Sequence, residues 1–245
     1  MSRLTRVADQ VKLTINNPER VTSLLTWGKV KALAFALVAS TSDKRLQAPW
    51  QQTDTKFLHR RYRSYDEYIR HQVSKLKTID LSDADVDYRA ILRNRVLSLG
   101  YVEPGLAVLC LAARLGTEVK SFLDIGCFAV GVDLNPGKGN SYVLTGDFNS
   151  LVFADDSVDA IFFNSLDHCF DIDTLLKEMS RVLKPGGVVV FEIALLHDKA
   201  TYYESFHWDS ISEVVDYISK AGFAPLVRLE IDYPWPGEHV CFRSE

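Results

Sequence analysis

The fold of this chain is decided by Leu106 to Gly137, which reads Leu-Ala-Val-Leu-Cys-Leu-Ala-Ala-Arg-Leu-Gly-Thr-Glu-Val-Lys-Ser-Phe-Leu-Asp-Ile-Gly-Cys-Phe-Ala-Val-Gly-Val-Asp-Leu-Asn-Pro-Gly. An uninterrupted apolar run opens the stretch, and a second one closes it before Asp133. Such runs are typical of parallel strands buried on both faces. The segment between them has room for a loop and a short helix. An acid that closes the second strand of such a unit indicates a nucleotide or nucleoside at the carboxyl ends of a parallel sheet.

The composition indicates an ordinary globular protein. A length of 245 residues favours one domain plus an extension, and 47% hydrophobic and 24% charged residues are usual for the class. The net charge of −4 argues against a nucleic-acid binder, because such binders neutralise phosphates with basic residues. The four cysteines form no CxxC pair, so neither a metal site nor a disulfide framework is expected.

Residues 1–55 are interpreted as an N-terminal extension and linker. Within them, residues 24–40 contain the apolar run Ala32 to Ala39, which is much shorter than the roughly 20 residues of a membrane-spanning helix. A helix packed on the domain is one interpretation, and N-terminal targeting or membrane association is the other. A cytoplasmic location is the default expectation. The stretch Thr41 to Thr55 reads as a linker.

Residues 56–105 are predicted to form a helical lid or cap. Ser64-Tyr-Asp-Glu67 has the pattern of a capping box at a helix start, and a second helix is expected to begin near Ser82 or Asp83. The basic residues before the first helix are interpreted as a solvated approach to it, with an anionic substrate or a membrane as the alternative partner; they are Lys56, His59, Arg60, Arg61 and Arg63.

Residues 106–245 are predicted to form a Rossmann-like α/β domain with a doubly wound, mostly parallel sheet. The further expected strands are Tyr142 to Asp147, Val158 to Asn164 and Val188 to Ile193, and Pro225 to Asp232 with Glu238 to Arg243 forms a closing antiparallel edge pair. One helix is expected from Asp171 or Asp173 to the stop signal Lys184-Pro-Gly-Gly187. Another is expected from a capping box, Ser210 to Glu213, to Gly222.

Three segments carry a resemblance to a known family. They are Arg181-Val-Leu-Lys-Pro-Gly-Gly187, which runs into a strand, then Gly131-Val-Asp-Leu134, and Gly146-Asp-Phe148. Their order and spacing resemble the class I S-adenosylmethionine-dependent methyltransferases, in particular the type 11-like group. The resemblance covers Leu106 to the C-terminus.

The glycine motif of that family is found by spacing. Leu123-Asp-Ile-Gly-Cys127 looks like it, but a strand at Phe128 would then follow without the crossover that parallel neighbours need. We therefore align Val108 to Gly116 with the motif and place the crossover helix at Thr117 to Gly126. Ala112 and Arg114 then stand where the family has glycines. Alanine costs little at residue 112 if its φ stays negative, and Arg114 is expected either to pair with the cofactor's carboxylate or to block the site.

The resemblance implies that S-adenosylmethionine is the cofactor and that its binding residues are Ala112, Arg114, Gly116, Asp133, Leu134, Asp147, Phe148, Asn164 and Ser165. Asp133 would accept hydrogen bonds from the ribose hydroxyls, and Asp147 would accept one from the adenine amino group. Each aspartate also has a structural interpretation, as a turn former and a strand-end cap respectively. The short connection Leu134 to Ser141 is expected to be a bare loop without a helix.

The resemblance implies methyl transfer to an O, N or C atom of a small-molecule or lipid acceptor. His168 is the candidate base, because histidine titrates near neutral pH, and Asp167 would orient it. A loop histidine without a catalytic role is the alternative. An acceptor pocket or a packed loop is expected from His197, Tyr202, Tyr203, His207 and Trp208. The competing functions are a non-catalytic methyltransferase-like partner subunit and an NAD(P)-binding oxidoreductase, but the GxGxxG fingerprint of the latter is absent.

Overall fold

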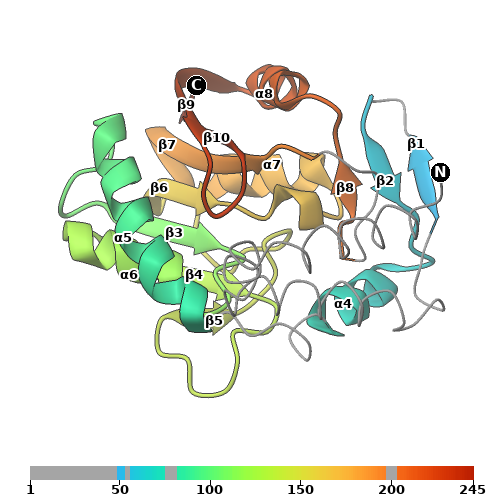
Figure 1. The fold of residues 1–245 in the computed structure, drawn as a ribbon, viewed down its shortest axis with the longest axis horizontal. Coiled ribbons are helices and arrows are strands. Elements are labelled where there is room, and N and C mark those ends of the chain that lie inside the picture. Colours follow the sequence, from blue (N-terminus) through green and yellow to red (C-terminus); the bar gives the residue numbers. More distant parts are fainter. Residues whose placement is uncertain (1–48, 53–55, 75–81, 197–202) are drawn as a thin grey trace, which may run out of the picture. The chain divides into compact units, whose positions relative to one another are not determined.

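A computed structural model describes residues 49–52, 56–74, 82–196 and 203–245 (Figure 1). These residues all belong to the compact unit Ala48–Glu245. Most of the predicted extension, including the apolar residues 24–40, lies outside the described residues. No described helix is both long enough and apolar enough to cross a membrane.

The sheet has seven strands in the order β5-β4-β3-β6-β7-β10-β9 (Figure 1). In chain order the strands are β3 (Ala107–Leu111), β4 (Phe128–Asp133), β5 (Val143–Thr145), β6 (Val158–Phe163), β7 (Leu183–Ala194), β9 (Phe223–Ile231) and β10 (Gly237–Ser244). The first five are parallel, and β10 pairs antiparallel with both β7 and β9. The predicted parallel sheet with an antiparallel edge pair is confirmed.

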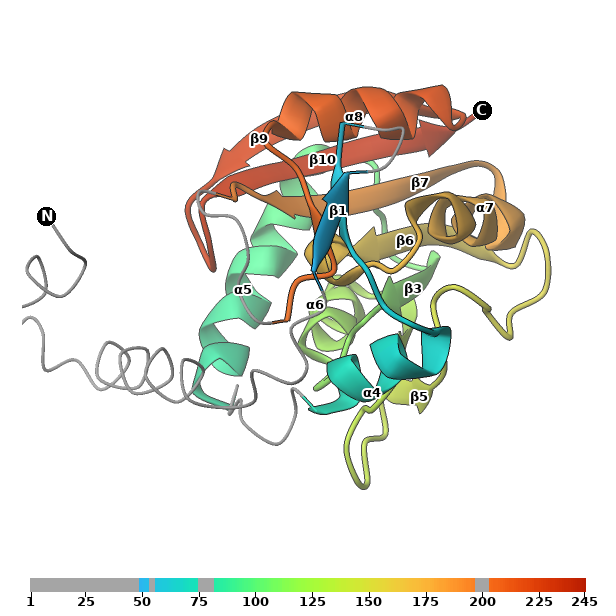
Figure 2. The same cartoon turned by 90° about the vertical axis from the view of Figure 1, so that its right-hand side faces the viewer.

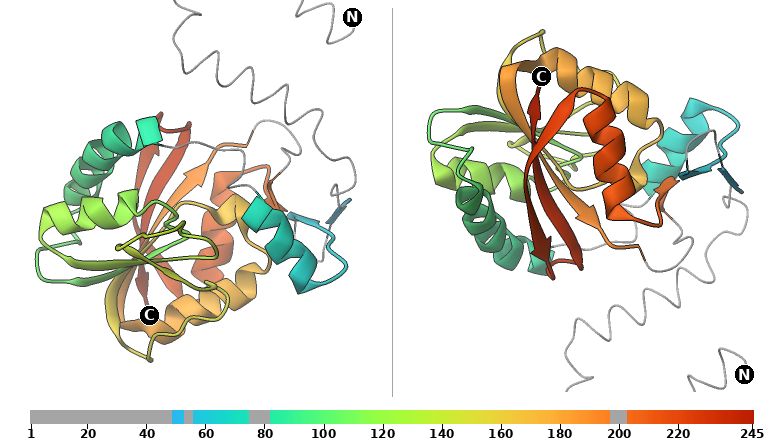
Figure 3. Two further views of the ribbon diagram at one scale, coloured as in Figure 1. Left: turned by 90° about the horizontal axis from the view of Figure 1, so that it is seen from below. Right: turned by 90° about the horizontal axis from the view of Figure 1, so that it is seen from above.

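Helices cover both faces of this sheet, as Figures 2 and 3 show. On one face lie α5 (Ser82–Leu99) and α6 (Thr117–Ile125), and on the other α7 (Ile172–Val182) and α8 (Ile211–Lys220). The side chains of successive strand residues point to opposite faces of the sheet. Leu109 packs with the core under α7 and α8, whereas Val108 and Cys110 pack with the core under α5 and α6. Burial on both faces is the reason why these strands read as unbroken apolar runs.

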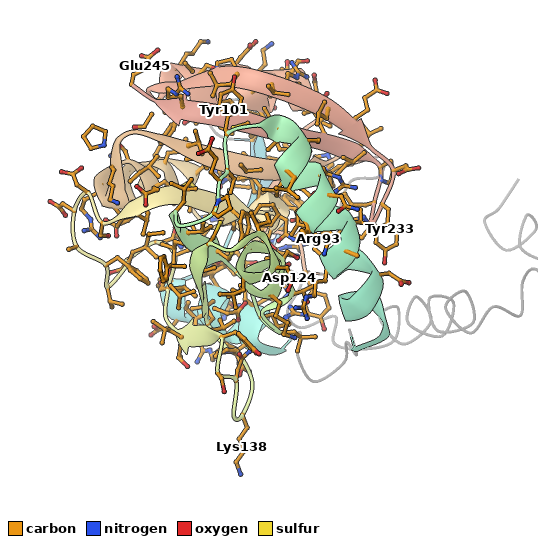
Figure 4. All side chains as sticks on the ribbon, turned by 90° about the vertical axis from the view of Figure 1, so that its left-hand side faces the viewer. Arg93, Tyr101, Asp124, Lys138, Tyr233 and Glu245 are labelled. Atoms are coloured by element: carbon orange, nitrogen blue, oxygen red, sulfur yellow. The ribbon has the colours of Figure 1, made fainter. Side chains whose placement is uncertain are left out.

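The crossover unit that opened the sequence analysis is confirmed. Strand β3 pairs parallel with β4 through Leu111 and Val132, and helix α6 lies between them, bounded by Gly116 and Gly126. Both glycines have positive φ, at 78° and 97°. The segment resembling a glycine motif is therefore the end of a helix. The loop after β4 contains no helix, as predicted, and Lys138 marks its tip (Figure 4).

The expected linker and the start of the helical region are wrong in part. Strands β1 (Trp50–Gln52) and β2 (Leu58–Arg60) form a small antiparallel sheet with β8 (Phe206–His207). Strand β1 pairs with β2, and β2 pairs with β8 about 150 residues further along the chain, so no local pattern reveals the sheet. Arg60 is buried, its Nε donates to the Glu204 carbonyl oxygen (2.6 Å), and its guanidinium lies over the Trp50 ring. It is therefore not part of a solvated basic approach, whereas Lys56 is exposed.

Each predicted capping box lies at the start of a helix, but not all of its expected hydrogen bonds are formed. Helix α4 (Tyr65–Ser74) follows Ser64, whose Oγ accepts from the Glu67 N–H at 3.3 Å. The Glu67 carboxylate, however, accepts from the N–H of Arg63 rather than from that of Ser64. Helix α8 follows Ser210, which makes no side-chain cap, and Glu213 instead pairs with Lys56 at 2.9 Å. Each glutamate has found a partner outside the expected motif. The predicted domain limits at residues 55 and 105 stay predictions.

Candidate functional site

A cavity of about 510 Å³ lies at the carboxyl ends of the parallel strands. Its wall includes Ala112 after β3, Asp133 at the end of β4, Asn164 after β6 and Ala194 at the end of β7. This is the edge at which open parallel sheets bind ligands, and the volume is within the range of small-molecule sites.

The cavity brings together most of the predicted site residues. Those that line it are Ala112, Arg114, Asp133, Leu134, Phe148, Asn164, Ser165, Asp167 and His168. Gly116 and Asp147 are not among the lining residues. Gly116 instead starts α6 and packs closely on β5, since a Cβ there would lie 2.9 Å from the Cβ of Tyr142. Glycine is needed at residue 116 for packing and for its positive φ, rather than for the cavity wall.

The loop after β3 keeps a glycine-like backbone without the glycines. Ala112 has φ of 54° and Arg114 has φ of 26°, so Ala112 does not have the negative φ at which alanine would cost little. Both residues are held in a region that L-residues disfavour. The surroundings impose the conformation: Gly131 of β4 has no room for a Cβ, which would lie 2.8 Å from the Cβ of Ala113. Because β4 lies so close to the loop, it fixes the position of the loop at the carboxyl end of β3.

Arg114 brings a positive charge to this end of the cavity. Its backbone N–H donates to Asp133 Oδ2 at 3.0 Å. Burial lowers the pKa of its guanidinium, and the charges of Asp133 and Glu118 oppose that shift. The side chain remains cationic at neutral pH. The cavity wall therefore presents a cation with carboxylates nearby, a set that suits an amino-acid zwitterion.

Asp133 has the turn-forming role that the sequence offered and is also positioned in the cavity wall. Its Oδ1 accepts from the backbone N–H of Asn135 at 2.8 Å, which forms the turn before Pro136, and its Oδ2 accepts from Arg114. Each carboxylate oxygen has two lone pairs, so each retains acceptor capacity toward the cavity. Two ribose hydroxyls can be bound without breaking the turn.

Asp147 is engaged elsewhere. Its carboxylate accepts from the Tyr65 hydroxyl of α4 and from the backbone and side-chain N–H groups of Asn149, the former at 2.8 Å. Phe148, by contrast, lines the cavity and is almost fully buried. Phe148 and Leu134, the residues predicted to border the adenine, therefore line the cavity, whereas Asp147 is directed to α4.

The histidine at the site is held by a main-chain carbonyl. His168 ends a short 3₁₀ helix (Leu166–His168), and its Nδ1 lies 3.0 Å from the carbonyl oxygen of Tyr203. Because a carbonyl oxygen only accepts, Nδ1 carries the proton, and Nε2 is the basic atom of the neutral ring. Asp167 Oδ2 lies 3.4 Å from Nε2. The orienting contact expected from Asp167 is thus made by Tyr203, and Asp167 faces the basic nitrogen.

A buried polar network behind the cavity was not anticipated. Glu192 of β7 is 1% exposed and accepts from Tyr88 Oη at 2.5 Å, from Arg95 Nη1 and from His239 Nδ1 at 3.1 Å. Burial raises the pKa of Glu192, but the contacts with His239, Arg95 and Tyr88 outweigh it and hold the pKa below its ordinary value. The carboxylate is therefore ionised at neutral pH.

This network reaches a predicted cofactor residue. Asn164 Nδ2 donates to Tyr88 Oη at 3.1 Å and to Glu118 Oε1 at 3.0 Å. Tyr88 and Glu118 both line the cavity, as does Glu192. In sequence, Tyr88 and Glu118 are unremarkable helix residues, and only Glu192, a charge inside an apolar strand run, offered a signal. Among the described residues no cluster of His, Cys, Asp and Glu is arranged to hold a metal ion.

Comparison with known proteins identifies the family. A methyltransferase domain family matches residues 109–191. The chain is 28% identical over 183 residues to the demethylmenaquinone methyltransferase of Corynebacterium efficiens, an alignment that covers 65% of this chain and 80% of that protein. It is 36% identical over 128 residues to the enzyme of the same name from Streptomyces avermitilis, covering 43% and 55%. The chain belongs to the class I S-adenosylmethionine-dependent methyltransferases.

Solved structures show the same fold for this methyltransferase. A 1,6-didemethyltoxoflavin-N1-methyltransferase from Burkholderia thailandensis has a TM-score of 0.59 at 16% identity and covers 80% of this chain and 99% of its own. A SAM-dependent methyltransferase from Aquifex aeolicus has a TM-score of 0.55 at 19% identity, with coverage of 67% and 97%. Both predictions, a methyltransferase and S-adenosylmethionine as its cofactor, are confirmed. The acidic Asp133, the cationic Arg114 and the apolar Phe148 in one cavity fit that cofactor.

Proposed function

We propose that this methyltransferase methylates a ring carbon of a neutral naphthalene diol, the reduced form of a naphthoquinone. The names of its curated relatives support this acceptor class: they are demethylmenaquinone methyltransferases, and the first of them is matched over 80% of its length. A lipid side chain on the ring and association with a membrane are part of the proposal.

The observation that carries the proposal is the mixed lining of the cavity. The loop after β3 and the end of β4 contribute charged and polar groups to it. The same cavity is also lined by apolar and aromatic side chains, namely Leu195, Leu196, Trp208, Pro234 and Trp235, which we call the apolar wall. A flat ring with few polar atoms matches that wall, because ligand pockets bind such bodies through apolar contact and orient them by a few polar groups.

The residues of the site have separate roles in the proposed reaction. When bound, the cofactor would supply an electrophilic methyl group for the ring carbon. The proton on that carbon would be released to solvent, and the hydroxyl proton taken up by His168 would return to the ring oxygen. Asp133 and Arg114 bind and orient the two ends of the cofactor. His168 Nε2 accepts a proton from the ring hydroxyl, which makes the neighbouring ring carbon electron-rich. Asp167, 3.4 Å from Nε2, stabilises the resulting imidazolium. The apolar wall keeps water from the transferred methyl group.

The test uses the full chain, S-adenosylmethionine and 2-prenyl-1,4-naphthohydroquinone kept reduced. We expect a product heavier by one methyl group, with the new carbon on the ring, detected by mass spectrometry and NMR. The His168→Gln variant should lose about 100-fold in kcat, since general-base catalysis contributes roughly that much. The matched variant His59→Gln, which lies in β2 outside the cavity wall, should keep its activity. An enzyme that binds S-adenosylhomocysteine but leaves the naphthohydroquinone unmethylated would rule out this acceptor.

A further inference from the structure

Trp235 has a buried hydrogen-bond donor that nothing in the described part of the chain satisfies. It lies in the connection between β9 and β10 and belongs to the apolar wall of the cavity. Its indole Nε1 is buried, with no hydrogen-bond acceptor among the described residues. An indole nitrogen only donates, so a ligand that enters the cavity is the partner that such a group lacks.

The position of the indole is fixed from both sides. The carbonyl oxygen of Tyr233 accepts from Arg95 Nη2 of α5 at 2.8 Å, and Figure 4 shows Tyr233 beside that helix. On the other side, the Pro236 carbonyl oxygen accepts from the N–H of Leu195 at 2.8 Å. Two hydrogen bonds therefore hold the residues that flank Trp235. Because this indole N–H is held in place and lacks an acceptor, it is suited to distinguishing ligands by whether they carry an acceptor atom.

The neighbouring tryptophan of the apolar wall provides the contrast. Trp208 is 2% exposed, and its Nε1 donates to the Ala194 carbonyl oxygen at 3.1 Å. That bond leaves Trp208 to contribute only its apolar surface to a ligand. Of these two indoles in one wall, only that of Trp235 has its donor left for a ligand.

We infer that Trp235 selects the acceptor by donating a hydrogen bond from Nε1 to a ring oxygen. The ligand class is a flat, apolar ring that carries a carbonyl or hydroxyl oxygen, and the inference rests on the proposed function for the identity of that ring. A site built to bond such an oxygen rejects a ring that lacks it, because the indole N–H is then left unpaired. Trp235 is a specificity-determining residue, and the proton transfer remains with His168.

The experiment measures binding to enzyme saturated with S-adenosylhomocysteine. One probe is 2,3-dimethyl-1,4-naphthoquinone, whose substituted ring resists both thiols and methylation, and the other is 2,3-dimethylnaphthalene, which has no oxygen. We expect Trp235→Phe to lower the ratio of quinone to hydrocarbon affinity about 10-fold, as one lost hydrogen bond implies. The same change at Trp208 should leave the ratio unchanged. Binding of S-adenosylhomocysteine should be the same in both variants and the wild type.

Each outcome separates the inference from the proposed function. A ratio that Trp235→Phe leaves unchanged, or a wild-type enzyme that does not prefer the quinone, overturns the role of Trp235. If the ratio falls as expected but the naphthohydroquinone is not methylated, the donor role stands and the proposed acceptor is wrong. Since the assay compares two ligands of one variant, a general loss of stability does not imitate the expected result.

Discussion

Arg114 occupies a position where the family has glycine, with φ of 26° and its side chain in the wall of the cavity. The backbone therefore adopts the loop geometry that glycine provides elsewhere, and the side chain adds a charge. Asp133 and Glu118 interact with that charge, which leaves a cation and two carboxylates around the polar end of the cavity. A methionine moiety carries one carboxylate and one ammonium group, so both kinds of partner are present.

The role of Arg114 can be tested by removing its charge and keeping its length. We expect Arg114→Met to weaken S-adenosylhomocysteine roughly 10- to 100-fold, the effect of a lost charged hydrogen bond, while 5′-methylthioadenosine, which lacks the amino-acid part, binds unchanged. Calorimetric titration of both ligands provides the measurement. Arg61→Met, an exposed site away from the cavity, is the control. Tighter binding of S-adenosylhomocysteine by Arg114→Met would show that the arginine blocks the site.

At the scale of elements, α4 is hydrogen-bonded to Asp147, the residue before Phe148 of the cavity wall. The Tyr65 hydroxyl at its first residue donates to Asp147, and burial, together with that carboxylate, raises the pKa of Tyr65. Tyr68 and Gln72 of the same helix line the cavity, and Gln72 Nε2 donates to the Tyr203 carbonyl oxygen that also holds His168. Helix α4 is therefore linked to Asp147 through Tyr65. Through Gln72 and the Tyr203 carbonyl oxygen it is also linked to the candidate base His168.

The tie between α4 and Asp147 leads to a prediction for cofactor binding. If Asp147 accepts the adenine amino group, as the family resemblance implies, Tyr65 competes for the same carboxylate. Tyr65→Phe should therefore raise the affinity for S-adenosylhomocysteine about two- to tenfold, the range of one neutral hydrogen bond. Tyr62→Phe, which loses hydrogen bonds to His71 and Ser205 instead, should not. An affinity that Tyr65→Phe leaves equal or lowers would mean that Asp147 serves the α4 contact alone.

At the scale of the whole molecule, the Glu192 network joins three elements that are distant in sequence. Arg95 comes from α5, Glu192 from β7 and His239 from β10. Removing one partner of a buried charge pair leaves the other charge uncompensated. We therefore expect Glu192→Gln to lower the free energy of unfolding by about 3 kcal/mol at pH 7. Glu230→Gln, at an exposed site on β9, should change it by less than about 0.5 kcal/mol.

The same network predicts a pH dependence. Since the pKa of Glu192 in the folded chain is below its ordinary value of 4.5, its stabilisation is fully present above that value. It is lost as the pH falls through the folded pKa. The difference in unfolding free energy between wild type and Glu192→Gln should be constant from pH 6 to 8 and shrink below about pH 4.5. Urea denaturation at each pH gives this difference, and a constant difference down to pH 3 would contradict an ionised Glu192.

The amino-acid sequence by itself determined the order and spacing of the parallel strands. Apolar runs such as Ala107–Leu111 are buried on both faces, and the number of residues between them and β4 allows only one position for the crossover helix. That constraint is local, so it identified Asp133 and placed Arg114 in the cofactor loop. The same spacing also indicated the two glycines at the ends of α6, Gly116 and Gly126, which both have positive φ.

The tertiary structure alone decided which side chains from distant segments complete the cavity wall. Tyr88, Glu192 and Trp235 come from a helix, a strand and a hairpin turn that are far apart in the chain, and they meet only because the sheet brings α5, β7 and β10 together. The same holds for the tie between Tyr65 and Asp147. Side-chain partners at such separations leave no periodic pattern in the sequence, since they are chosen by packing rather than by local backbone preference.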